Sequence, residues 1–494
     1  MLPAPAAPEA WRGVSVLSRT APSRRFRADL SPKSKEEVTL KITVVGLGRV
    51  GAVAASGLAL AGHDVLGVDI DHDRVAVLRE GNPSYYEPGI AERMAVVLQE
   101  GFLRVLHRDG VADDLGEVAV VTVGTPQVGQ CAAELNQVRE AISWVKHKRP
   151  RELVIAMKST VPPGTGLELM SKELSGTGIG YVSNPEFLRE GQAIRDWDCP
   201  DRVVIGAAPE GVRSVETVMR MYAGINAPVL VTDITSAEMV KYASNAFLAT
   251  RISFINEIAA LCDTLGASID DVSQGLAMDS RTGSRIHAGV GYGGSCLPKD
   301  VEMLYRLASA GGAESEVLRA ASEVNSRQRH LPLRSLRERF NSRLAGVEVA
   351  VLGLAFKPDT DDVRDAPALD LIRALIAEGA KVRAFDPEAG GLAKEQLPSL
   401  AQVVDGVEEA TAGAQAMCLV TEWDEIVGAD WTAVARRMVP PRFVFDGRNA
   451  LDPHEMRRLG FEYVGIGRNG NARTMSAAAA APALCSASND GGRK

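Results

Sequence analysis

The segment most informative about the architecture is Lys41-Ile-Thr-Val-Val-Gly-Leu-Gly-Arg-Val-Gly51, in which a β-branched run leads into a G-x-G-x-x-G turn. Such a turn predicts the end of a buried strand and the start of a helix, here through Val53 to Leu60. The next apolar run, Asp64–Val68, predicts a second strand, and Asp69 ends it about twenty residues after the turn. This spacing is typical of a dinucleotide-binding βαβ unit.

The glycines of this turn, Gly46, Gly48 and Gly51, are expected to let a pyrophosphate rest on the N-terminus of the helix. Asp69 is expected to accept hydrogen bonds from the ribose hydroxyls and to repel a 2′-phosphate, so the predicted cofactor is NAD rather than NADP. Arg74 is also a candidate cofactor residue and by itself would favour NADP, but we expect Asp69 to dominate. A glycine turn that only packs a strand on a helix is the alternative at this point.

Two stretches of the chain alternate predicted strands and helices, which indicates an α/β protein. We expect two Rossmann-like domains, each a doubly wound parallel sheet, joined by a long central helix. That helix is predicted to start at the capping box Thr235-Ser-Ala-Glu238 and to stop at Gly266. Further strands are predicted at 118–123, 153–156 and 203–205 in the first stretch, and at 347–352, 381–385, 416–420 and 443–445 in the second.

The composition argues against several classes of protein. The 494 residues are 46% hydrophobic and 24% charged, with a formal net charge of -8 and no basic stripe, which argues against a nucleic-acid partner. No apolar run approaches the roughly 20 residues that a membrane span needs, so no membrane association is expected. The six cysteines form no C-x-x-C pair, so we expect a reducing compartment, the cytoplasm, and no metal site.

A second segment, Gly289-Val-Gly-Tyr-Gly-Gly-Ser-Cys-Leu-Pro-Lys-Asp300, places one cysteine in a glycine-rich turn. Pro298 and the apolar spacing after it predict a helix, so Cys296 lies at or just before a helix N-terminus, close to Lys299. Both features are expected to favour the thiolate over the thiol and to make Cys296 a nucleophile. On this segment alone, a packed cysteine without any chemistry remains open.

Taken with several other motifs, these two segments resemble a known family. The chain is similar to the nucleotide-sugar 6-dehydrogenases, the group of UDP-glucose and GDP-mannose dehydrogenases, from about residue 41 to 466. Its closest likeness is to the UDP-glucose 6-dehydrogenases. The motifs that carry the resemblance are the G-x-G-x-x-G turn, Tyr86-Glu-Pro-Gly89, Val123-Gly-Thr-Pro126, Lys158-Ser-Thr-Val-Pro162, Asn184-Pro-Glu-Phe-Leu-Arg-Glu-Gly191, Lys241-Tyr-Ala-Ser-Asn245, the Cys296 segment, Phe356-Lys-Pro358 and Asp446-Gly-Arg-Asn449.

The resemblance implies that a sugar CH2OH group is oxidised to a carboxylate by two successive hydride transfers to two NAD+. The aldehyde would stay bound to the cysteine, first as a thiohemiacetal and then as a thioester that water hydrolyses. The catalytic residues that the resemblance implies are Cys296, Lys241, Asn245, Asp300, Glu186 and Thr160.

The resemblance also implies a role for each catalytic residue other than the nucleophile Cys296. Lys241 and Asn245, four residues apart on the predicted long helix, would donate to the oxyanion, and Lys241 is also a candidate base in the first oxidation. Glu186 would activate the water. Asp300 would anchor the Lys241 ammonium or a catalytic water, and Thr160 would hold the water or a substrate oxygen.

The resemblance also implies binding residues. Arg281, Lys357 and Arg448 would hold the diphosphate, and Arg281 would reach in from a neighbouring subunit, so we expect a homodimer or a higher homo-oligomer. The other implied substrate residues are Phe187, Leu188, Gly289, Tyr292, Gly293 and Phe356. The further implied cofactor residues are Thr125, Glu190, Lys299 and Arg364.

The composition of the two tails, the predicted strands and helices, and the resemblance together give the expected domains. They are a disordered tail over 1–39, an NAD-binding Rossmann domain over 40–230, a central helical domain over 231–330 for dimerisation and the active site, a Rossmann-like UDP-sugar-binding domain over 331–468, and a disordered tail over 469–494.

The chain departs from the resemblance at position 49, where the family usually has an aromatic residue and this chain has Arg49, which is expected to add a phosphate contact. The predicted substrate is UDP-glucose, converted to UDP-glucuronate, with GDP-mannose as the second choice and UDP-N-acetylmannosamine as the third. Two other classes stay open: a single-step 2-hydroxy-acid dehydrogenase of the 6-phosphogluconate type, and a non-catalytic NAD-sensing or scaffold protein. The Cys296 segment speaks against the first, and the complete set of catalytic residues against the second.

Overall fold

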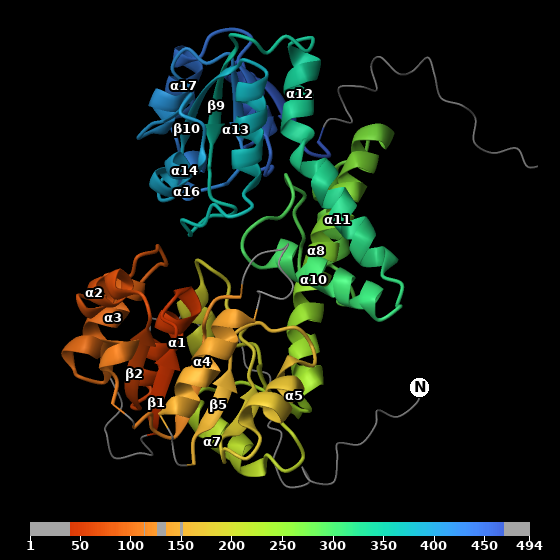
Figure 1. Ribbon diagram of the computed structural model, residues 1–494. Coiled ribbons are helices and arrows are strands. Elements are labelled where there is room, and N and C mark those ends of the chain that lie inside the picture. Colours follow the sequence, from red (N-terminus) through yellow and green to blue (C-terminus); the bar gives the residue numbers. More distant parts are fainter. Residues whose placement is uncertain (1–39, 113, 126–134, 149–151, 469–494) are drawn as a thin grey trace, which may run out of the picture. The chain divides into compact units, whose positions relative to one another are not determined.

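The computed structural model describes residues 40–112, 114–125, 135–148 and 152–468. The two tails that were expected to be disordered, 1–39 and 469–494, lie outside the described residues. The chain forms two compact units, each built around one sheet (Figure 1). The first unit comprises the residues up to Leu248 with Gly294–Leu318 and Lys357–Asp362, and the second comprises Ala249–Gly293, Arg319–Phe356 and the residues from Val363 onward.

The first unit contains an eight-stranded sheet in the order β3-β2-β1-β4-β5-β6-β7-β8. Its neighbouring strands are parallel except β6 and β7, which meet antiparallel at Ser183 and Gly206. The predicted doubly wound sheet is confirmed, with one antiparallel pair and three strands, β3, β6 and β8, that the sequence did not predict. The strands are β1 Lys41–Val45, β2 Asp64–Asp69, β3 Leu103–His107, β4 Val118–Val121, β5 Val154–Met157, β6 Gly180–Ser183, β7 Val203–Gly206 and β8 Val229–Thr232.

Successive residues of the central strands alternate between two apolar clusters, because the side chains of a strand point to opposite faces of its sheet. Ile42 and Val44 of β1 belong to one cluster, and Val45 belongs to the other. A parallel sheet that is covered on both faces needs such continuously apolar strands. The helices of this unit are α1 Arg49–Leu60, α2 His72–Arg79, α3 Ile90–Gln99, α4 Asn136–His147, α5 Thr165–Leu169, α6 Ala193–Asp198, α7 Val212–Met221 and α10 Leu297–Ala310.

The long helix α8 (Ile234–Leu265) has 32 residues and ends where the sequence predicted. The capping box predicted at its start is wrong. The carboxylate of Asp233 accepts hydrogen bonds from the backbone N–H and the hydroxyl of Ser236, so Asp233 takes the cap position predicted for Thr235. A carboxylate also interacts favourably with the positive end of the helix dipole. The side chain of Glu238, which was expected to reach back to the cap, forms its hydrogen bonds with another segment.

The second unit contains a six-stranded parallel sheet in the order β11-β10-β9-β12-β13-β14, the same order as the first six strands of the other sheet. Figure 1 shows α13 alongside β9 and β10. The strands are β9 Glu348–Leu352, β10 Lys381–Phe385, β11 Ala401–Val403, β12 Ala416–Leu419, β13 Phe443–Asp446 and β14 Glu462–Gly465. The helices are α9 Ile269–Ala277, α11 Glu316–Arg329, α12 Leu331–Arg339, α13 Pro367–Ala377, α14 Gly390–Gln396, α15 Val407–Thr411, α16 Asp424–Val427, α17 Trp431–Arg437 and α18 Pro453–Arg458.

The turn after β9 resembles the turn after β1 in its backbone but differs from it in its residues. Gly353 adopts φ +84°, close to the +91° of Gly46, and Ala355 stands where the first turn has Gly48. Asp386 follows β10 in the same way that Asp69 ends β2. Both oxygens of Asp386 accept hydrogen bonds from other groups of the protein. The carboxylate of Asp386 accepts hydrogen bonds from the backbone N–H groups of Leu354, Ala355, Glu388 and Ala389 and from the indole N–H of Trp423.

Candidate active site

The glycine turn after β1 is closed on one side and open on the other. A Cβ at Gly51 would lie 1.9 Å from the carbonyl oxygen of Gly46, and Gly46 itself has φ +91°, so both positions require glycine. A Cβ at Gly48 would meet nothing within 4 Å. The turn therefore packs tightly against its own strand and leaves free space at Gly48, where a pyrophosphate would approach the N-terminus of α1. This arrangement fits a dinucleotide.

The carboxylate of Asp69 is held at the end of β2. It is buried and accepts hydrogen bonds from the N–H groups of Leu47 at 2.7 Å and Asp71 at 2.9 Å. The guanidinium of Arg74 donates to the two oxygens of the same carboxylate, at 3.1 and 3.2 Å. The charge of Arg74 is thus paired with Asp69, and the role of Asp69 in the preference for NAD stays a prediction.

Four charged or polar side chains form a buried cluster in the first unit. The ammonium of Lys241 donates to Glu186 Oε1 at 3.0 Å, and the amide of Asn245 donates to Asp300 Oδ2 at 2.6 Å. Lys241 and Asn245 lie one turn apart on α8, whereas Asp300 lies in the first turn of α10. The second oxygen of Asp300 accepts a hydrogen bond from Lys299 at 2.6 Å. The structure therefore pairs Asp300 with Asn245 and Lys299, and pairs Lys241 with Glu186.

Cys296 is the N-cap residue of α10, as predicted, with a proline in the first turn of the helix. Its side chain is exposed to solvent although many protein atoms surround it, and Ser295 Oγ lies 3.5 Å from its sulfur. The expectation that its position favours the thiolate is wrong for this arrangement. Desolvation raises the pKa of the Cys296 thiol, and the carboxylates of Glu186 and Asp300 raise it further, against the lowering effect of Lys241 and Ser295.

Lys241 keeps its proton in this cluster. Burial lowers the pKa of the Lys241 ammonium, but the carboxylates of Glu186 and Asp300, together with the neighbouring Cys296, outweigh that effect and raise this pKa overall. A group that is already protonated cannot accept a proton, so Lys241 is suited to donate to an oxyanion rather than to act as a base in the first oxidation.

The turn that carries Glu186 is fixed by residues to which the sequence analysis gave no role. Asn184 is completely buried; its amide donates to the carbonyl of Val204 at 2.9 Å, and its side-chain oxygen accepts from the hydroxyl of Tyr222 at 2.6 Å. The buried ammonium of Lys158 lies 3.5 Å from the carbonyl of Asn184. Lys158 and Asn184 both belong to motifs of the family resemblance, which was the available signal for them.

Glu238 is a buried carboxylate on α8, three residues before Lys241. It accepts hydrogen bonds from the N–H groups of Gly164 at 2.6 Å and Gly166 at 2.8 Å. These glycines begin the segment that follows Thr160, a half-buried residue three positions beyond β5. Glu238 thus ties the segment after Thr160 to the helix that carries Lys241. Burial raises the pKa of Glu238 to about 7, in spite of its two backbone hydrogen bonds.

This raised pKa predicts a pH-dependent stability. The pKa of the Glu238 carboxyl group is near 4.5 in the unfolded chain and about 7 in the folded chain. Its contribution to the free energy of unfolding is therefore fully present below pH 4.5 and is lost as the pH rises through 7. The loss amounts to about 3 kcal/mol. We expect Glu238→Gln to remove this part of the pH dependence in urea-unfolding curves at pH 5 and pH 8. Equal pH dependence of the free energy of unfolding in both proteins would contradict it.

The glycine-rich segment before Cys296 is anchored in the second unit. The N–H of Gly289 donates to Asn256 Oδ1 at 2.8 Å, and Gln328 donates to the carbonyl of Gly289 at 2.8 Å. Asn325 accepts from the N–H of Tyr292 at 2.8 Å and donates to its carbonyl at 3.0 Å. These three amide side chains come from α8 and α11, and sequence reasoning missed them because buried asparagines and glutamines leave no motif.

Three predicted substrate residues of the second unit come together. Arg448 donates to the carbonyl of Phe356 at 3.0 Å and to that of Val420 at 2.7 Å, and it forms an ion pair with Glu422 at 3.2 Å. A Cβ at Gly289 would lie 3.3 Å from Arg448 Nη1. Gly293 must be glycine, because a Cβ there would lie 2.2 Å from the carbonyl oxygen of Asp365.

Each of the other predicted residues lies within one of the two units. Arg281 is 87% exposed and pairs with Asp279, two residues away. Arg364 is exposed in the second unit, and Thr125 is half-buried at the edge of the described residues. In the first unit, burial lowers the pKa of Lys357. Phe187 is half-buried with the guanidinium of Arg202 3.8 Å above its ring, and Leu188 donates its N–H to Glu186.

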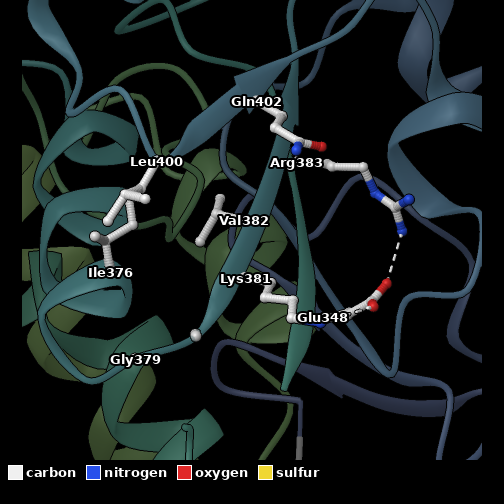
Figure 2. A pocket seen from close by; sticks show the side chains of 9 residues that line it. Glu348, Ile376, Gly379, Lys381, Val382, Arg383, Leu400 and Gln402 are labelled. Atoms are coloured by element: carbon white, nitrogen blue, oxygen red, sulfur yellow. Dashed lines mark hydrogen bonds and ion pairs between the residues drawn. The ribbon is translucent and has the colours of Figure 1, made fainter. Parts of the chain in front are cut away.

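A pocket of about 550 Å³ in the second unit contains none of the candidate residues (Figure 2). It lies at β10, and its two cations are paired: Arg383 with Glu348 at 3.2 Å and Lys381 with the same carboxylate at 3.8 Å. Over the part of the chain that the structure describes, no helix is long and apolar enough to cross a membrane. Within those same residues, no group of three or more His, Cys, Asp or Glu side chains is placed to hold a metal ion.

Comparison with known proteins covers nearly all the described chain. Models of the UDP-glucose/GDP-mannose dehydrogenase family match at residues 40–226 (NAD binding domain), 235–327 (central domain) and 350–453 (UDP binding domain). The chain is 39% identical over 439 residues to UDP-glucose 6-dehydrogenase YwqF of Bacillus subtilis and 40% identical over 447 residues to UDP-glucose 6-dehydrogenase of Pseudomonas aeruginosa, in both cases over 87% of this chain and 98% of the other. A solved UDP-glucose dehydrogenase from Pyrobaculum islandicum superposes with a TM-score of 0.80 and 34% identity, over 88% of this chain and 99% of that one.

Proposed function

This chain belongs to the UDP-glucose/GDP-mannose dehydrogenase family, and from that premise we propose that it oxidises the C6 hydroxymethyl group of UDP-glucose to the carboxylate of UDP-glucuronate. It is an NAD-dependent oxidoreductase. The observation that carries the proposal is the buried cluster of two hydrogen-bonded pairs, Lys241 with Glu186 and Asn245 with Asp300. The charges of Lys241, Glu186 and Asp300 all act on the Cys296 sulfur. Each of these side chains has a use in a four-electron oxidation through a thioester.

The residues of the first unit fit NAD. The open side of the turn at Gly48 receives the pyrophosphate, and the carboxylate of Asp69 receives the ribose hydroxyls. Thr125, Glu190, Lys299 and Arg364 remain proposed cofactor contacts. When bound, the nicotinamide supplies the hydride acceptor for each oxidation.

In the first oxidation, the sugar hydroxyl loses a proton and its carbon loses a hydride. Lys241 and Asn245 donate hydrogen bonds to the oxygen as its negative charge develops. Because Lys241 is held as an ammonium, we propose that the hydroxyl proton is released to water rather than taken up by Lys241.

In the second oxidation, the Cys296 thiol releases its proton to water, and the thiolate adds to the aldehyde carbon and forms a thiohemiacetal, with its oxyanion again facing Lys241 and Asn245. Loss of hydride from that carbon leaves a thioester. Glu186, as a carboxylate, takes a proton from water as the water attacks the thioester carbonyl, and the thiolate of Cys296 leaves. Thr160 is the proposed contact for this water or for the substrate oxygen.

The nucleotide sugar requires contacts beyond the reacting carbon. We assign the diphosphate to Arg448, Lys357 and Arg281, and this rests on the family motifs together with the matched UDP binding domain. The remaining proposed substrate contacts are Phe187, Leu188, Gly289, Tyr292, Gly293 and Phe356. GDP-mannose and UDP-N-acetylmannosamine stay the second and third candidate substrates, and the 40% identity to a UDP-glucose 6-dehydrogenase favours UDP-glucose.

The test of this function is a count of products. With limiting UDP-glucose and excess NAD+, two NADH are expected for each UDP-glucose consumed, and the sugar product should carry a new carboxylate by mass spectrometry. GDP-mannose and UDP-N-acetylmannosamine at the same concentration should give much lower kcat/KM. One NADH per sugar would remove the thioester route and would support the single-step dehydrogenase instead. No NADH from any nucleotide sugar would favour a non-catalytic protein.

The finer points of assembly and location are part of the same proposal. We propose a homodimer or higher homo-oligomer, supported by exposed apolar side chains along α8, among them Phe247, Phe254 and Leu261. Light scattering of the pure protein measures its mass, and a monomer at micromolar concentration would exclude the proposed oligomer.

A cytoplasmic location is supported by four free cysteines within the described residues, Cys199, Cys262, Cys296 and Cys418. The expected division at 40–230, 231–330 and 331–468 stays a proposal.

A further inference from the structure

Arg49 is the first residue of α1 and lies inside the cofactor turn, next to Gly48. Its guanidinium forms an ion pair with Asp361 and lies 3.9 Å from the carboxylate of Glu190. It also lies 4.9 Å from the centre of the Tyr85 ring, which is cation–π distance. Only 21% of the Arg49 side chain is exposed, so these partners, rather than solvent, surround its charge. The contact of Arg49 with a phosphate stays a prediction.

The two carboxylates beside Arg49 are held by other groups as well. Asp361 accepts a hydrogen bond from the N–H of Tyr86 at 2.9 Å. Glu190 accepts from the hydroxyls of Thr360 and Ser295, both at 3.2 Å. The exposed fractions of the Asp361 and Glu190 side chains are 11% and 18%. Their negative charges thus stay within reach of the cofactor turn whether or not the arginine is there.

The charges at this place would oppose the cofactor without Arg49. A pyrophosphate carries two negative charges, and it would enter a turn flanked by Asp361 and Glu190, with Asp362 close enough to act on the same guanidinium. Burial lowers the pKa of Arg49, but these three carboxylates outweigh burial and raise it, so the arginine is a permanent cation. Arg49 stands between negative protein groups and a negative ligand, and like charges at such short range repel strongly when the water between them is limited.

We propose that Arg49 is a positioning residue of the cofactor site that acts through Asp361 and Glu190, by neutralising two fixed carboxylates that would otherwise repel NAD. The inference rests on NAD binding at the glycine turn, which is part of the function proposed above. It differs from a direct contact between Arg49 and phosphate in one measurable way. If the arginine acts through Asp361, then removing the charge of Asp361 compensates for removing the charge of Arg49.

The experiment is NAD binding to the full chain by isothermal calorimetry. Arg49→Gln is expected to weaken NAD binding roughly tenfold. Asp361→Asn should bind NAD at least as tightly as the unaltered chain, since Arg49 is then a surplus cation. The double variant Arg49→Gln with Asp361→Asn should recover most of the lost affinity. The matched control is Arg220→Gln, which removes an equal charge from an exposed pair with Glu117. Glu117 precedes the amino end of β4, whereas the glycine turn follows the carboxyl end of β1, so NAD affinity should be unchanged.

Two results would overturn the proposal. Arg49→Gln with unchanged NAD affinity would show that the carboxylates need no neutralising, and a double variant as weak as Arg49→Gln would show direct contact with phosphate instead. Circular dichroism and thermal unfolding verify that each variant is folded. Should Arg49→Gln not fold, Arg49→Lys, which keeps the charge, is expected to retain NAD affinity to within about threefold, and a larger loss would count against charge neutralisation. Failure of the unaltered chain to bind NAD would instead sink the proposed function as a whole.

Discussion

The Cys296→Ser variant is expected to lose steady-state oxidation of UDP-glucose by several orders of magnitude, because a serine hydroxyl is a much weaker nucleophile and a poorer leaving group than a thiol. The first hydride transfer needs no sulfur, so NADH should still appear in a burst of about one equivalent per site before turnover stalls. Stopped-flow absorbance at the NADH band separates the burst from the steady state.

The matched control for this substitution is Cys199→Ser. Cys199 is also a free, exposed cysteine of the first unit, but it follows α6 and has no part in the buried cluster. Its variant should keep the full rate. If Cys296→Ser turns over at the rate of the unaltered chain, the sulfur has no role in the reaction. If neither variant shows a burst, the loss reflects damaged binding rather than a missing nucleophile.

The second large effect is expected for Glu186→Gln, which should slow thioester hydrolysis by about two to four orders of magnitude, the range for a lost general base. Glutamine keeps an oxygen that can accept the hydrogen bond from Lys241 but cannot accept the proton of the attacking water. The acyl group should therefore accumulate on Cys296. Intact-protein mass spectrometry after mixing with UDP-glucose and NAD+ should show one added sugar-nucleotide mass.

Two comparisons make this result decisive. Glu216→Gln, an exposed glutamate on α7, loses the same charge and should show neither the adduct nor the slow rate. A Glu186→Gln protein that turns over slowly without an adduct would assign Glu186 to an earlier step, such as proton uptake from the hydroxyl. The double variant with Cys296→Ser should lose any adduct, which places the acyl group on the sulfur.

The parts of the fold that local chemistry decides were predictable from the sequence. β-branched runs and the glycine turn located the central strands of both sheets, and the apolar pattern located the end of α8. The start of α8 was misjudged because two residues competed for the cap: Thr235 had the better motif, but Asp233 is a carboxylate. The missed strands β3, β6, β8, β11 and β14 have three to five residues each, and an apolar run so short is ambiguous on its own.

The composition of the candidate site was predictable from motifs, whereas its electrostatics was not. The helix N-terminus and the nearby Lys299 suggested an easily ionised Cys296. In the structure, Lys299 gives its hydrogen bond to Asp300, and Glu186 approaches from 110 positions earlier in the chain. Such long-range partners follow only from the folded topology. The same holds for Arg49, whose carboxylate partner Asp361 is 312 residues away.

The locked carboxylate of Asp386 has a consequence for the order of events in a turnover. In the described part of the chain, the second sheet has Ala355 where the first has the open Gly48, and Asp386 accepts five hydrogen bonds from the protein, so we place the dinucleotide at a single site, on the first sheet. A four-electron oxidation with one dinucleotide site has to use that site twice. The aldehyde intermediate must therefore stay bound while NADH dissociates and a second NAD+ binds. A covalent bond to the sulfur is one way to prevent its dissociation during this exchange.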